Sequence, residues 1–285
     1  MHNEEGNVEP LYQAISDTMK NLKRSYEIIF VNDASADRTL SVMKQIQGRD
    51  PHFHFINLES NVGENWALLA GVSKASGAII VTIDGDGQND PAYIPALLEE
   101  LSRGYRVVSG WRRQRTGDFW TRRFPSLVAN ALIRAITGIP VHDCGCGLKV
   151  YRREVLEGRY VPKGFMNRFS PVVLGVKRNE FSEVEIADRV RNSGRSHYGI
   201  ERVFIVLRDL LTLPFAVRET GRWLDRFRWL QWVWLAMGLL LAISGWRFSA
   251  LLLILLALAS FSNARSLKRF VEAQAKPQFR IQEFR

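Results

Sequence analysis

The chain has 285 residues, 46% of them hydrophobic, and a formal net charge of +10. That length suffices for one sizeable core plus an appendage. A basic balance favours nucleic acid or an anionic membrane surface as a partner. The sequence has no basic helix–turn–helix pattern and no zinc-ligand spacing, so the membrane surface is the favoured partner.

The first third of the chain alternates between helical and strand-like patterns. We expect helices at 7–22, 37–46, 63–74 and 91–101, and strands at 26–33, 53–58, 78–83 and 105–110. Alternating strands and helices predict an α/β domain with a mostly parallel sheet and crossover helices. Ligands of such sheets lie beyond the carboxyl ends of the strands, where Asn32-Asp33 and Asp84/Asp86 both fall.

The first residues have a loop-like pattern, although a doubly wound domain usually opens with a strand. We therefore expect the first strand of the sheet to be missing from this chain; a different strand order is the alternative. The opening "HNEEGN" is acidic and polar, so we expect no signal peptide.

The stretch "IIVTIDGDGQNDP", from Ile79 to Pro91, ends a strand-like run with three carboxylates and an amide. Asp84 and Asp86 can both face one cation from a turn, because a single glycine separates them. Gln88 adds a neutral oxygen. Hard oxygen ligands around an open position suit Mg²⁺ or Mn²⁺, with a substrate diphosphate completing the coordination. A plain Asp-Gly turn is the alternative for this motif alone.

The cysteines, Cys144 and Cys146, are separated by one residue. They cannot form a disulfide framework, which indicates a reducing compartment. Two thiols alone are also a poor metal site.

An apolar pattern at 203–217 is interrupted by Arg208 and Asp209, and arginines follow at 218, 222, 226 and 228. This pattern is typical of a helix at the membrane interface with a basic rim.

A long apolar tract follows, in which Arg247 is the only charged residue between Trp229 and Ala264. The tract is too long for one ordinary membrane crossing, and "SGWRF" from Ser244 marks a turn, so we expect two short transmembrane helices in a hairpin. Tryptophans near its ends fit interfacial belts, and basic residues on both flanks place both ends in the cytoplasm. A buried helical pair in a soluble domain is the alternative.

Six motifs occur in a characteristic order: "VNDASADRT" from Val31, "NVGENWALLAGVSKASG" from Asn61, "DGDGQNDP" from Asp84, "GWRRQR" from Gly110, "HDCGCGLKVYRREVL" from His142 and "RVRNSGRSHYG" from Arg189. Together they resemble family 2 glycosyltransferases of the polyprenyl-phosphate type, such as dolichyl-phosphate mannose synthase and its bacterial undecaprenyl-phosphate relatives. The resemblance extends from Asn3 to about Leu213. The six motifs together are specific to this family, whereas any one of them alone is not.

The resemblance implies a GT-A catalytic domain at 1–198 that binds a nucleotide sugar. An amphipathic interfacial segment at 199–228, a transmembrane hairpin at 229–264 and a cytoplasmic tail at 265–285 would follow. The protein would then be a multi-pass protein of the inner (plasma) membrane with its catalytic domain in the cytoplasm. The oligomeric state stays open.

The resemblance also implies roles for individual residues. Glu4 would line the nucleotide pocket, and Asp33 would recognise the base or ribose. Asp84, Asp86 and Gln88 would hold the metal and the diphosphate, and Arg191 would close over the donor phosphates. The lipid phosphate would be held by Arg112, Arg122 and Ser126, of which the last two share a helix face by their spacing; a solvated or membrane-facing surface is the alternative. The chain departs from the common family pattern at Asn32, Asn167 and His197.

The implied function is metal-dependent, inverting transfer of a sugar from a UDP- or GDP-linked donor to a polyprenyl phosphate at a membrane, with Asp86, Arg191 and Asp143 as catalytic residues. An acceptor phosphate, with its second pKa near 6, is largely ionised at neutral pH and needs little help from a base. Asp143 would orient substrate, or serve as base if the acceptor were a hydroxyl. The sugar, the nucleotide and the prenol length stay open.

Two other functions are kept as alternatives. "ETGRW" from Glu219 faintly resembles the Gln-x-x-Arg-Trp motif of processive polysaccharide synthases, although apolar helices for a channel are few. A non-catalytic membrane scaffold that binds nucleotide sugar is the other. A dinucleotide-binding dehydrogenase is excluded, since no G-x-G-x-x-G follows a strand.

Overall fold

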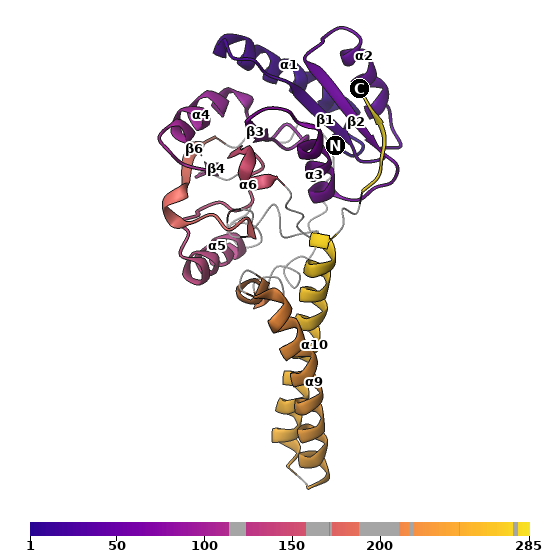
Figure 1. Cartoon of the computed structure of the whole chain (residues 1–285), viewed down its shortest axis with the longest axis vertical. Coiled ribbons are helices and arrows are strands. Elements are labelled where there is room, and N and C mark those ends of the chain that lie inside the picture. Colours follow the sequence, from indigo (N-terminus) through magenta and orange to yellow (C-terminus); the bar gives the residue numbers. More distant parts are fainter. Residues whose placement is uncertain are drawn as a thin grey trace. The chain divides into compact units, whose positions relative to one another are not determined.

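The computed structural model describes residues 1–113, 124–157, 171, 173–187, 211–216, 219–244, 246–275 and 279–285 (Figure 1). The chain divides into two compact units, one formed by Met1–Tyr198 with Pro277–Arg285 and the other by Gly199–Lys276. Along the sequence, the second unit is therefore inserted between two parts of the first.

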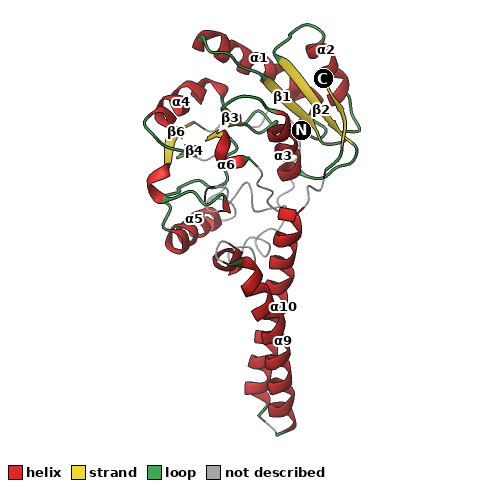
Figure 2. Cartoon of the chain, in the orientation of Figure 1, coloured by secondary structure: helices red, strands yellow, loops and turns green. Residues whose placement is uncertain are grey.

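The first unit alternates helices and strands over most of its length (Figure 2). The helices and strands expected between residues 7 and 110 all form, with bounds within a few residues of those expected. The elements are α1 (Glu5–Leu22), β1 (Ile28–Asn32), α2 (Thr39–Gln47), β2 (Phe53–Leu58), α3 (Glu64–Lys74), β3 (Ile79–Thr82), the 3₁₀ turn η1 (Pro91–Tyr93), α4 (Ile94–Ser102), β4 (Val107–Arg112), α5 (Phe124–Thr137), β5 (Lys149–Arg152), α6 (Arg153–Leu156), the 3₁₀ turn η3 (Arg178–Glu180), β6 (Phe181–Ile186) and β7 (Ile281–Phe284).

The expectation of a mostly parallel sheet is wrong for the described strands. They form two mixed sheets, with the strand orders β1-β2-β7 and β3-β5-β4-β6. The pairs β1–β2 and β4–β6 are parallel, whereas β2–β7, β3–β5 and β4–β5 are antiparallel. The reason is that β5 runs back between β3 and β4, and β7 joins β2 from the far end of the sequence. Neither connection is a strand–helix–strand crossover.

The opening residues lie beside β1. The backbone nitrogen of Met1 donates to the Val31 carbonyl at 2.7 Å, and the Asp33 nitrogen donates to the Met1 carbonyl at 2.8 Å. β1 and β3 are each the last strand on one side of their sheets.

Two hydrophobic clusters fix the sheets against their helices. One gathers Val8, Leu11 and Ile15 of α1 with Phe30, Phe53 and other side chains of β1, β2 and α2. The other packs the apolar face of α4 against Val108, Ile186 and neighbouring side chains of β4, β5 and β6. Burying these side chains stabilises the fold by about 25 cal/mol per Å² of apolar surface, and it leaves the strand ends free to carry polar residues.

The second unit is built around two long helices, α9 (Thr220–Ile243) and α10 (Arg247–Ala275). They pack closely where Gly238 of α9 meets Ala250 and Ile254 of α10, since a Cβ atom there would lie 3.1 to 3.3 Å from those residues. The arginine-rich stretch at 222–228 belongs to α9, and the expected interfacial position of residues 199–228 stays a proposal. Residues 199–210 lie outside the described residues.

Many large apolar side chains of this helical pair are exposed, among them Trp229, Trp232, Leu240, Ile243, Phe248, Leu251, Leu255 and Phe261. By length and composition, one described helical segment, Arg247–Glu272, could cross a membrane. A transmembrane hairpin therefore stays a proposal.

The expectation that 265–285 is a tail is wrong as a description of structure. α10 continues to Ala275, and Ile281–Phe284 form β7, which pairs with β2 in the first unit. The alternating burial of β7 explains the pairing, because Ile281 packs with Ile56 and Leu58 in a third hydrophobic cluster.

Candidate active site

The turn after β1 carries Asp33, whose side chain is buried. Its carboxylate oxygens accept from the backbone nitrogens of Val62 at 2.8 Å and Gly63 at 2.9 Å. Gly63 has a φ of 87°, a conformation that favours glycine, and it precedes α3. Asp33 therefore ties the end of β1 to the start of α3, as a residue expected to shape a nucleotide pocket would.

Glu4 lies before α1 at the same end of the sheet. Its backbone nitrogen donates to Thr39 Oγ1 at 2.9 Å, and its Oε2 accepts from Asn7 Nδ2 at 2.5 Å. Met1 links this region to the turn after β3, because a Cβ atom on Gly85 would overlap the Met1 side chain. The structure thus brings Glu4, Asp33 and the turn around Gly85 together at one edge.

Asp84, two residues after β3, is the most perturbed acid of the described site. It keeps partial solvent exposure. Desolvation of its carboxylate, together with the negative charges of Glu64 and Asp86, nevertheless raises its pKa to about 7, while Lys149 and Arg112 oppose the shift. Because these neighbours disfavour the charged form of Asp84, a cation bound beside it would stabilise that form.

Gly147 and Lys149 shape the surroundings of Asp84. The Asp84 carboxylate lies against Gly147, where a Cβ atom would overlap it. The Lys149 side chain is buried, and its Nζ donates to the carbonyl of Cys146 at 2.5 Å and to that of Cys144 at 3.4 Å. Thr82 Oγ1 donates to the Gly147 carbonyl at 2.9 Å and fixes the turn against β3.

The residues after β3 fit a divalent cation in part. Among the described residues, no group of three or more His, Cys, Asp or Glu side chains is arranged to hold a metal by itself. The Gln88 backbone nitrogen donates to Asp86 Oδ1 at 3.1 Å, which fixes Asp86 in the turn. Mg²⁺ often binds to one or two carboxylates, with substrate phosphates and waters completing its coordination, and Asp84 with Asp86 suits that mode.

Arg112, at the end of β4, forms a buried ion pair with Asp143. Its Nε lies 2.7 Å from Asp143 Oδ2 and its Nη2 lies 3.2 Å from Oδ1, and the two side chains are 5% and 6% exposed. Gly145 N also donates to Asp143 Oδ1, at 3.2 Å. Asp143 therefore holds the guanidinium of Arg112 in a fixed orientation, which supports an orienting role over a basic one.

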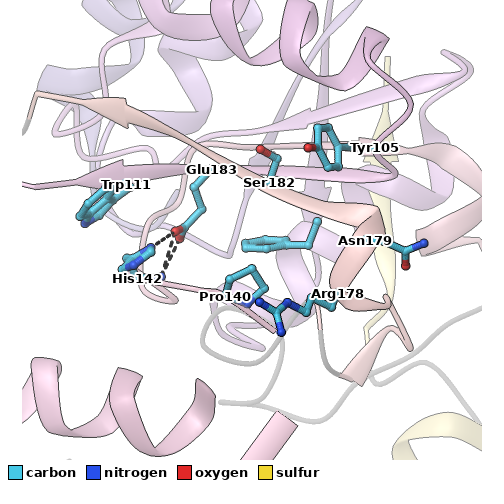
Figure 3. A pocket seen from close by; sticks show the side chains of 9 residues that line it. Tyr105, Trp111, Pro140, His142, Arg178, Asn179, Ser182 and Glu183 are labelled. Atoms are coloured by element: carbon cyan, nitrogen blue, oxygen red, sulfur yellow. Dashed lines mark hydrogen bonds and ion pairs between the residues drawn. The ribbon is translucent and has the colours of Figure 1, made fainter. Parts of the chain in front are cut away.

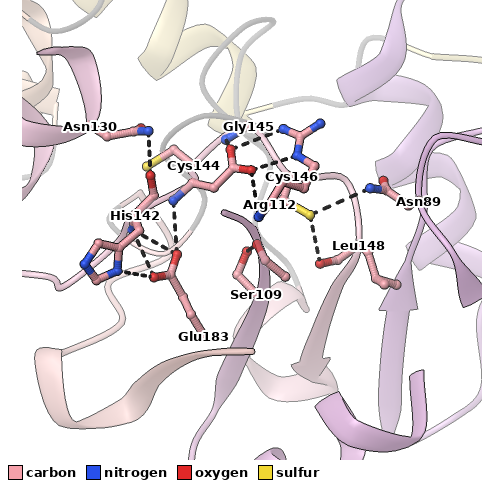
Figure 4. A network of polar contacts seen from close by, with 12 residues as sticks. Asn89, Ser109, Arg112, Asn130, His142, Cys144, Gly145, Cys146, Leu148 and Glu183 are labelled. Carbon is pink, nitrogen blue, oxygen red and sulfur yellow. Dashed lines mark hydrogen bonds and ion pairs between the residues drawn. The ribbon is translucent and has the colours of Figure 1, made fainter. Parts of the chain in front are cut away.

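Glu183 on β6 holds the loop that carries Asp143 (Figure 4). Its carboxylate accepts from the backbone nitrogens of His142 at 2.9 Å and Asp143 at 3.2 Å. It also lies 2.7 Å from His142 Nδ1. Burial raises the pKa of Glu183, while the hydrogen bonds from His142 and Asp143 act in the opposite direction.

A cavity of about 790 Å³ opens beside this loop (Figure 3). The ring of Trp111 stacks on that of His142 with centroids 4.4 Å apart, and both residues line the cavity with Glu183, Phe181 and Arg178. The cavity lies on the face of β4 and β6 that carries Trp111 and Glu183, whereas α4 covers the face of Val108 and Ile186.

Several expected site residues are not among the side chains that the structure describes. Arg122 and Arg191 lie outside the described residues, as do Asn167 and His197, and the side chain of Ser126 is not among those described. The structure therefore brings together the residues expected on the donor side and Arg112 with Asp143, while the rest of the expected phosphate-binding set stays a prediction.

Three residues that shape the candidate site were not predicted from the sequence: Gly147, Lys149 and Glu183. A lysine inside the strand-like "LKVY" is a signal of a paired buried charge, and Glu183 alternates with apolar residues in "FSEVEI".

Cys144 and Cys146 are buried free thiols. Burial raises their pKa values to about 12 and about 11. Both therefore stay protonated near neutral pH, which makes them unsuitable as metal ligands or nucleophiles.

The sequence profile of the family "Glycosyl transferase family 2" matches residues 1–159. Two relatives illustrate the similarity. A dodecaprenyl-phosphate galacturonate synthase of Rhizobium johnstonii is 38% identical over 224 residues, which cover 77% of this chain and 66% of the relative. An undecaprenyl-phosphate 4-deoxy-4-formamido-L-arabinose transferase of Pseudomonas paraeruginosa is 32% identical over 213 residues, which cover 74% of this chain and 62% of the relative. The matched region is thus less than two thirds of the length of each relative.

The fold is similar to that of solved glycosyltransferases. The glucosyl-3-phosphoglycerate synthase of Mycobacterium tuberculosis in complex with Mn²⁺ and uridine-diphosphate-glucose superimposes with a TM-score of 0.58 at 20% identity, over 76% of each chain. The same enzyme in complex with phosphoglyceric acid gives a TM-score of 0.57 at 19% identity, over 76% of this chain and 77% of the enzyme. At this level of identity the likeness shows the fold, a GT-A-like one with mixed sheets and helices.

The contact between Gly147 and Asp84 predicts a stability cost for a small substitution. Gly147→Ala should lower the free energy of unfolding by about 1–3 kcal/mol, because the added methyl group must displace the carboxylate or the turn. Gly48→Ala is the matched control, since a Cβ atom there meets its nearest atoms at 3.7 Å. Thermal melts of both purified variants in one detergent measure the difference, and equal melting temperatures would contradict the contact.

The buried pair of Arg112 and Asp143 predicts a second contrast. Asp143→Asn should cost about 3–5 kcal/mol of stability, because it removes the charged half of a buried, doubly hydrogen-bonded ion pair. The neighbouring Arg113 pairs with Glu185 at 3.1 Å with both side chains more than half exposed, so Glu185→Gln should cost less than about 1 kcal/mol. Urea unfolding curves compare the two variants, and similar midpoints would show that the inner pair is no stronger than the outer one.

Proposed function

The chain belongs to glycosyl transferase family 2, and we propose that it transfers a sugar from a nucleotide diphosphate sugar to a polyprenyl phosphate at a membrane. The observation that carries this proposal is that one short segment adjoins both residues. A Cβ atom on Gly147 would overlap the Asp84 carboxylate, and one on Gly145 would lie 3.6 Å from Arg112 Nη2. This supports placing the acid expected at the donor diphosphate and the arginine expected at the acceptor phosphate in one site. The names of the two relatives support the polyprenyl-phosphate acceptor and the sugar-transfer reaction.

The donor would bind where β1 and β3 end. Asp33 holds the loop before α3 through Val62 and Gly63, and this loop would form the wall of the nucleotide pocket. Asp84 and Asp86 would hold a divalent cation, which when bound would neutralise the diphosphate and stabilise its departure. The Mn²⁺ in the similar solved structure supports a divalent cation without deciding between Mg²⁺ and Mn²⁺.

The acceptor would enter opposite the donor, with its phosphate on Arg112. A phosphate monoester is largely ionised near neutral pH, so it can attack without a general base. One phosphate oxygen forms a bond to the anomeric carbon while the bond from that carbon to the nucleoside diphosphate breaks, and the configuration inverts. Asp143 has both oxygens engaged by Arg112 and Gly145, so its task is to orient Arg112.

The helical pair would anchor this chemistry in the membrane. Its exposed tryptophans and leucines form a large apolar surface, which a soluble monomer rarely exposes. The parts of the chain before and after the helical unit belong to one folded unit, so they must lie on the same side of any membrane. An even number of crossings follows, which supports a hairpin of α9 and α10 at the inner membrane with the first unit in the cytoplasm.

The two alternatives receive less support. The residues compared with a polysaccharide synthase motif lie at the start of α9, where Glu219 forms an exposed ion pair with Arg222 at 2.7 Å. A non-catalytic scaffold that binds nucleotide sugar would use the same acids at Asp84 and Asp86, so the transfer assay below decides between it and the enzyme.

The proposed reaction predicts transfer activity that depends on Asp86. Membranes containing the protein should move radiolabel from one of a panel of donors to undecaprenyl phosphate; the panel holds UDP-glucose, GDP-mannose, a UDP-linked uronic acid and a UDP-linked modified pentose. Asp86→Asn should lower kcat by about 10²–10³, the usual loss when a group that stabilises developing charge is removed.

Asp90→Asn is the matched control for that experiment. Asp90 lies in the same loop and accepts from the Ala92 nitrogen at the start of η1, and asparagine is an equally good cap. Activity should therefore persist in this variant. Full activity of Asp86→Asn in the presence of a chelator would sink the proposed metal role, and a wild-type protein inactive with every donor would favour the scaffold.

The proposed topology predicts a labelling pattern for single cysteines. In intact spheroplasts, a membrane-impermeant maleimide should label Ser244→Cys, between α9 and α10, from outside the cell. It should not label Lys20→Cys or Arg280→Cys, since both positions are exposed in the cytoplasmic unit. Detergent-lysed spheroplasts supply the control, because all three variants should then react. Outside labelling at Arg280→Cys would overturn the hairpin.

A further inference from the structure

Strand β7 builds one side of the sheet that leads to the candidate donor pocket, although it follows the helical unit in sequence (Figure 1). It pairs antiparallel with β2, matching Ile56 with Phe284 and Asn57 with Glu283. Backbone hydrogen bonds join Phe55 and Arg285 in both directions, at 2.9 and 3.2 Å. Residues 281–284 are therefore part of the first unit.

A chain of side-chain amides runs from β7 to the turn after β1. Asn57 Nδ2 donates to Gln282 Oε1 at 2.7 Å, and Asn32 Nδ2 donates to Asn57 Oδ1 at 2.7 Å. Asn32 Oδ1 in turn accepts from the Ser35 nitrogen at 3.3 Å. Asn32 is 1% exposed and Asn57 is 8% exposed. Water therefore has little access to these two amides, and they depend on protein groups for their hydrogen bonds.

The end of this chain touches the proposed donor pocket. Asn32 immediately precedes Asp33, whose carboxylate holds the nitrogens of Val62 and Gly63. A buried amide that loses its partner must turn or recruit water, and either response changes the turn to which it belongs. Gln282 is therefore connected to the turn that carries Asp33 through the two amides of Asn57 and Asn32.

A second set of contacts, which is apolar, joins the segment before β7 to the loop at Val62 and Gly63. Phe279 and Ile281 pack in one hydrophobic cluster with Val62 and with Ala67 and Ala70 of α3. The rings of Phe279 and Trp66 lie 6.2 Å apart, and the Trp66 nitrogen donates to the Gly63 carbonyl at 3.1 Å. The segment at 279–282 thus supports both the turn that carries Asp33 and the loop that Asp33 holds.

We propose that β7 is a built-in part of the donor site and that Gln282 is a positioning residue for the Asp33 turn. This inference rests on the proposed function and adds a residue that lies outside the motifs of the resemblance. Donor binding and docking of β7 are then linked, and each must strengthen the other by the same factor.

A neighbouring residue of β7 provides a control. Glu283 lies opposite Asn57 in register, but its carboxylate pairs with Lys44 at 2.8 Å and with Arg285 at 3.1 Å. Glu283→Ala therefore removes ion pairs of the same strand and leaves the hydrogen bonds between the amides in place. Gln282→Ala removes the acceptor of Asn57 Nδ2, and Gln282→Glu keeps an acceptor there.

The experiment uses the full chain in detergent, titrated by calorimetry with UDP and with GDP in the presence of Mn²⁺. Gln282→Ala should weaken binding of the nucleotide that the wild type prefers by about fivefold, the effect of one lost hydrogen bond. It should raise KM for the donor while KM for undecaprenyl phosphate and kcat stay unchanged. Glu283→Ala and Gln282→Glu should both behave as the wild type.

Hydrogen exchange tests the linkage without any substitution. In the wild type, saturating nucleotide should slow exchange of the amides at 281–284, whereas those of α4 stay unaffected. Equal nucleotide affinities of Gln282→Ala and Glu283→Ala, a parallel rise of both KM values, or unchanged exchange in β7 would each overturn the inference alone. A wild-type protein that binds neither UDP nor GDP would overturn the proposed function and this inference with it.

Discussion

The crowded carboxylate of Asp84 is the constraint on which the described site depends. An acid placed among other acids needs positive charge close by, and β5 supplies it. Lys149 is the first residue of β5 and pairs in register with Thr82 of β3 on one side and Ser109 of β4 on the other. An antiparallel strand between β3 and β4 thus delivers a buried ammonium group to the end of β3 and the middle of β4.

Around Asp84, buried side chains of positive and negative charge alternate. Arg112 opposes the negative charge of Asp84 and is held by Asp143, and Glu183 holds the backbone of the Asp143 loop. Each buried charge therefore has a partner, so the desolvation cost of one group is offset by the next. A consequence for mechanism is that Asp143 is committed to Arg112, which fits an acceptor that arrives already ionised.

Local patterns were sufficient to predict the helices and strands between residues 7 and 110 and the positions of Asp33 and Asp84 at strand ends. These features depend on hydrophobic periodicity and on turn residues, both of which are local. Strand order was not predictable in this way, because β5 and β7 reach their places through long-range pairing. The roles of Gly147 and Lys149 were not predicted for the same reason. The close contact of Gly147 with Asp84 and the burial of the Lys149 ammonium group exist only once β5 lies beside β3.

The insertion of the helical unit between β6 and β7 orders the assembly of the site. The hydrogen bond between Asn57 and Gln282 spans 225 residues of sequence, and Gln282 is synthesised after α9 and α10. The amide chain to Asn32 therefore closes only when both helices exist. The entropy cost of closing so long a loop grows only slowly with its length, and compact helices between the two ends shorten the span further. In the proposed function, the first unit would gain its complete donor side only after the helical pair has been made. Donor binding would then depend, through the order of the sequence, on the presence of the helical pair.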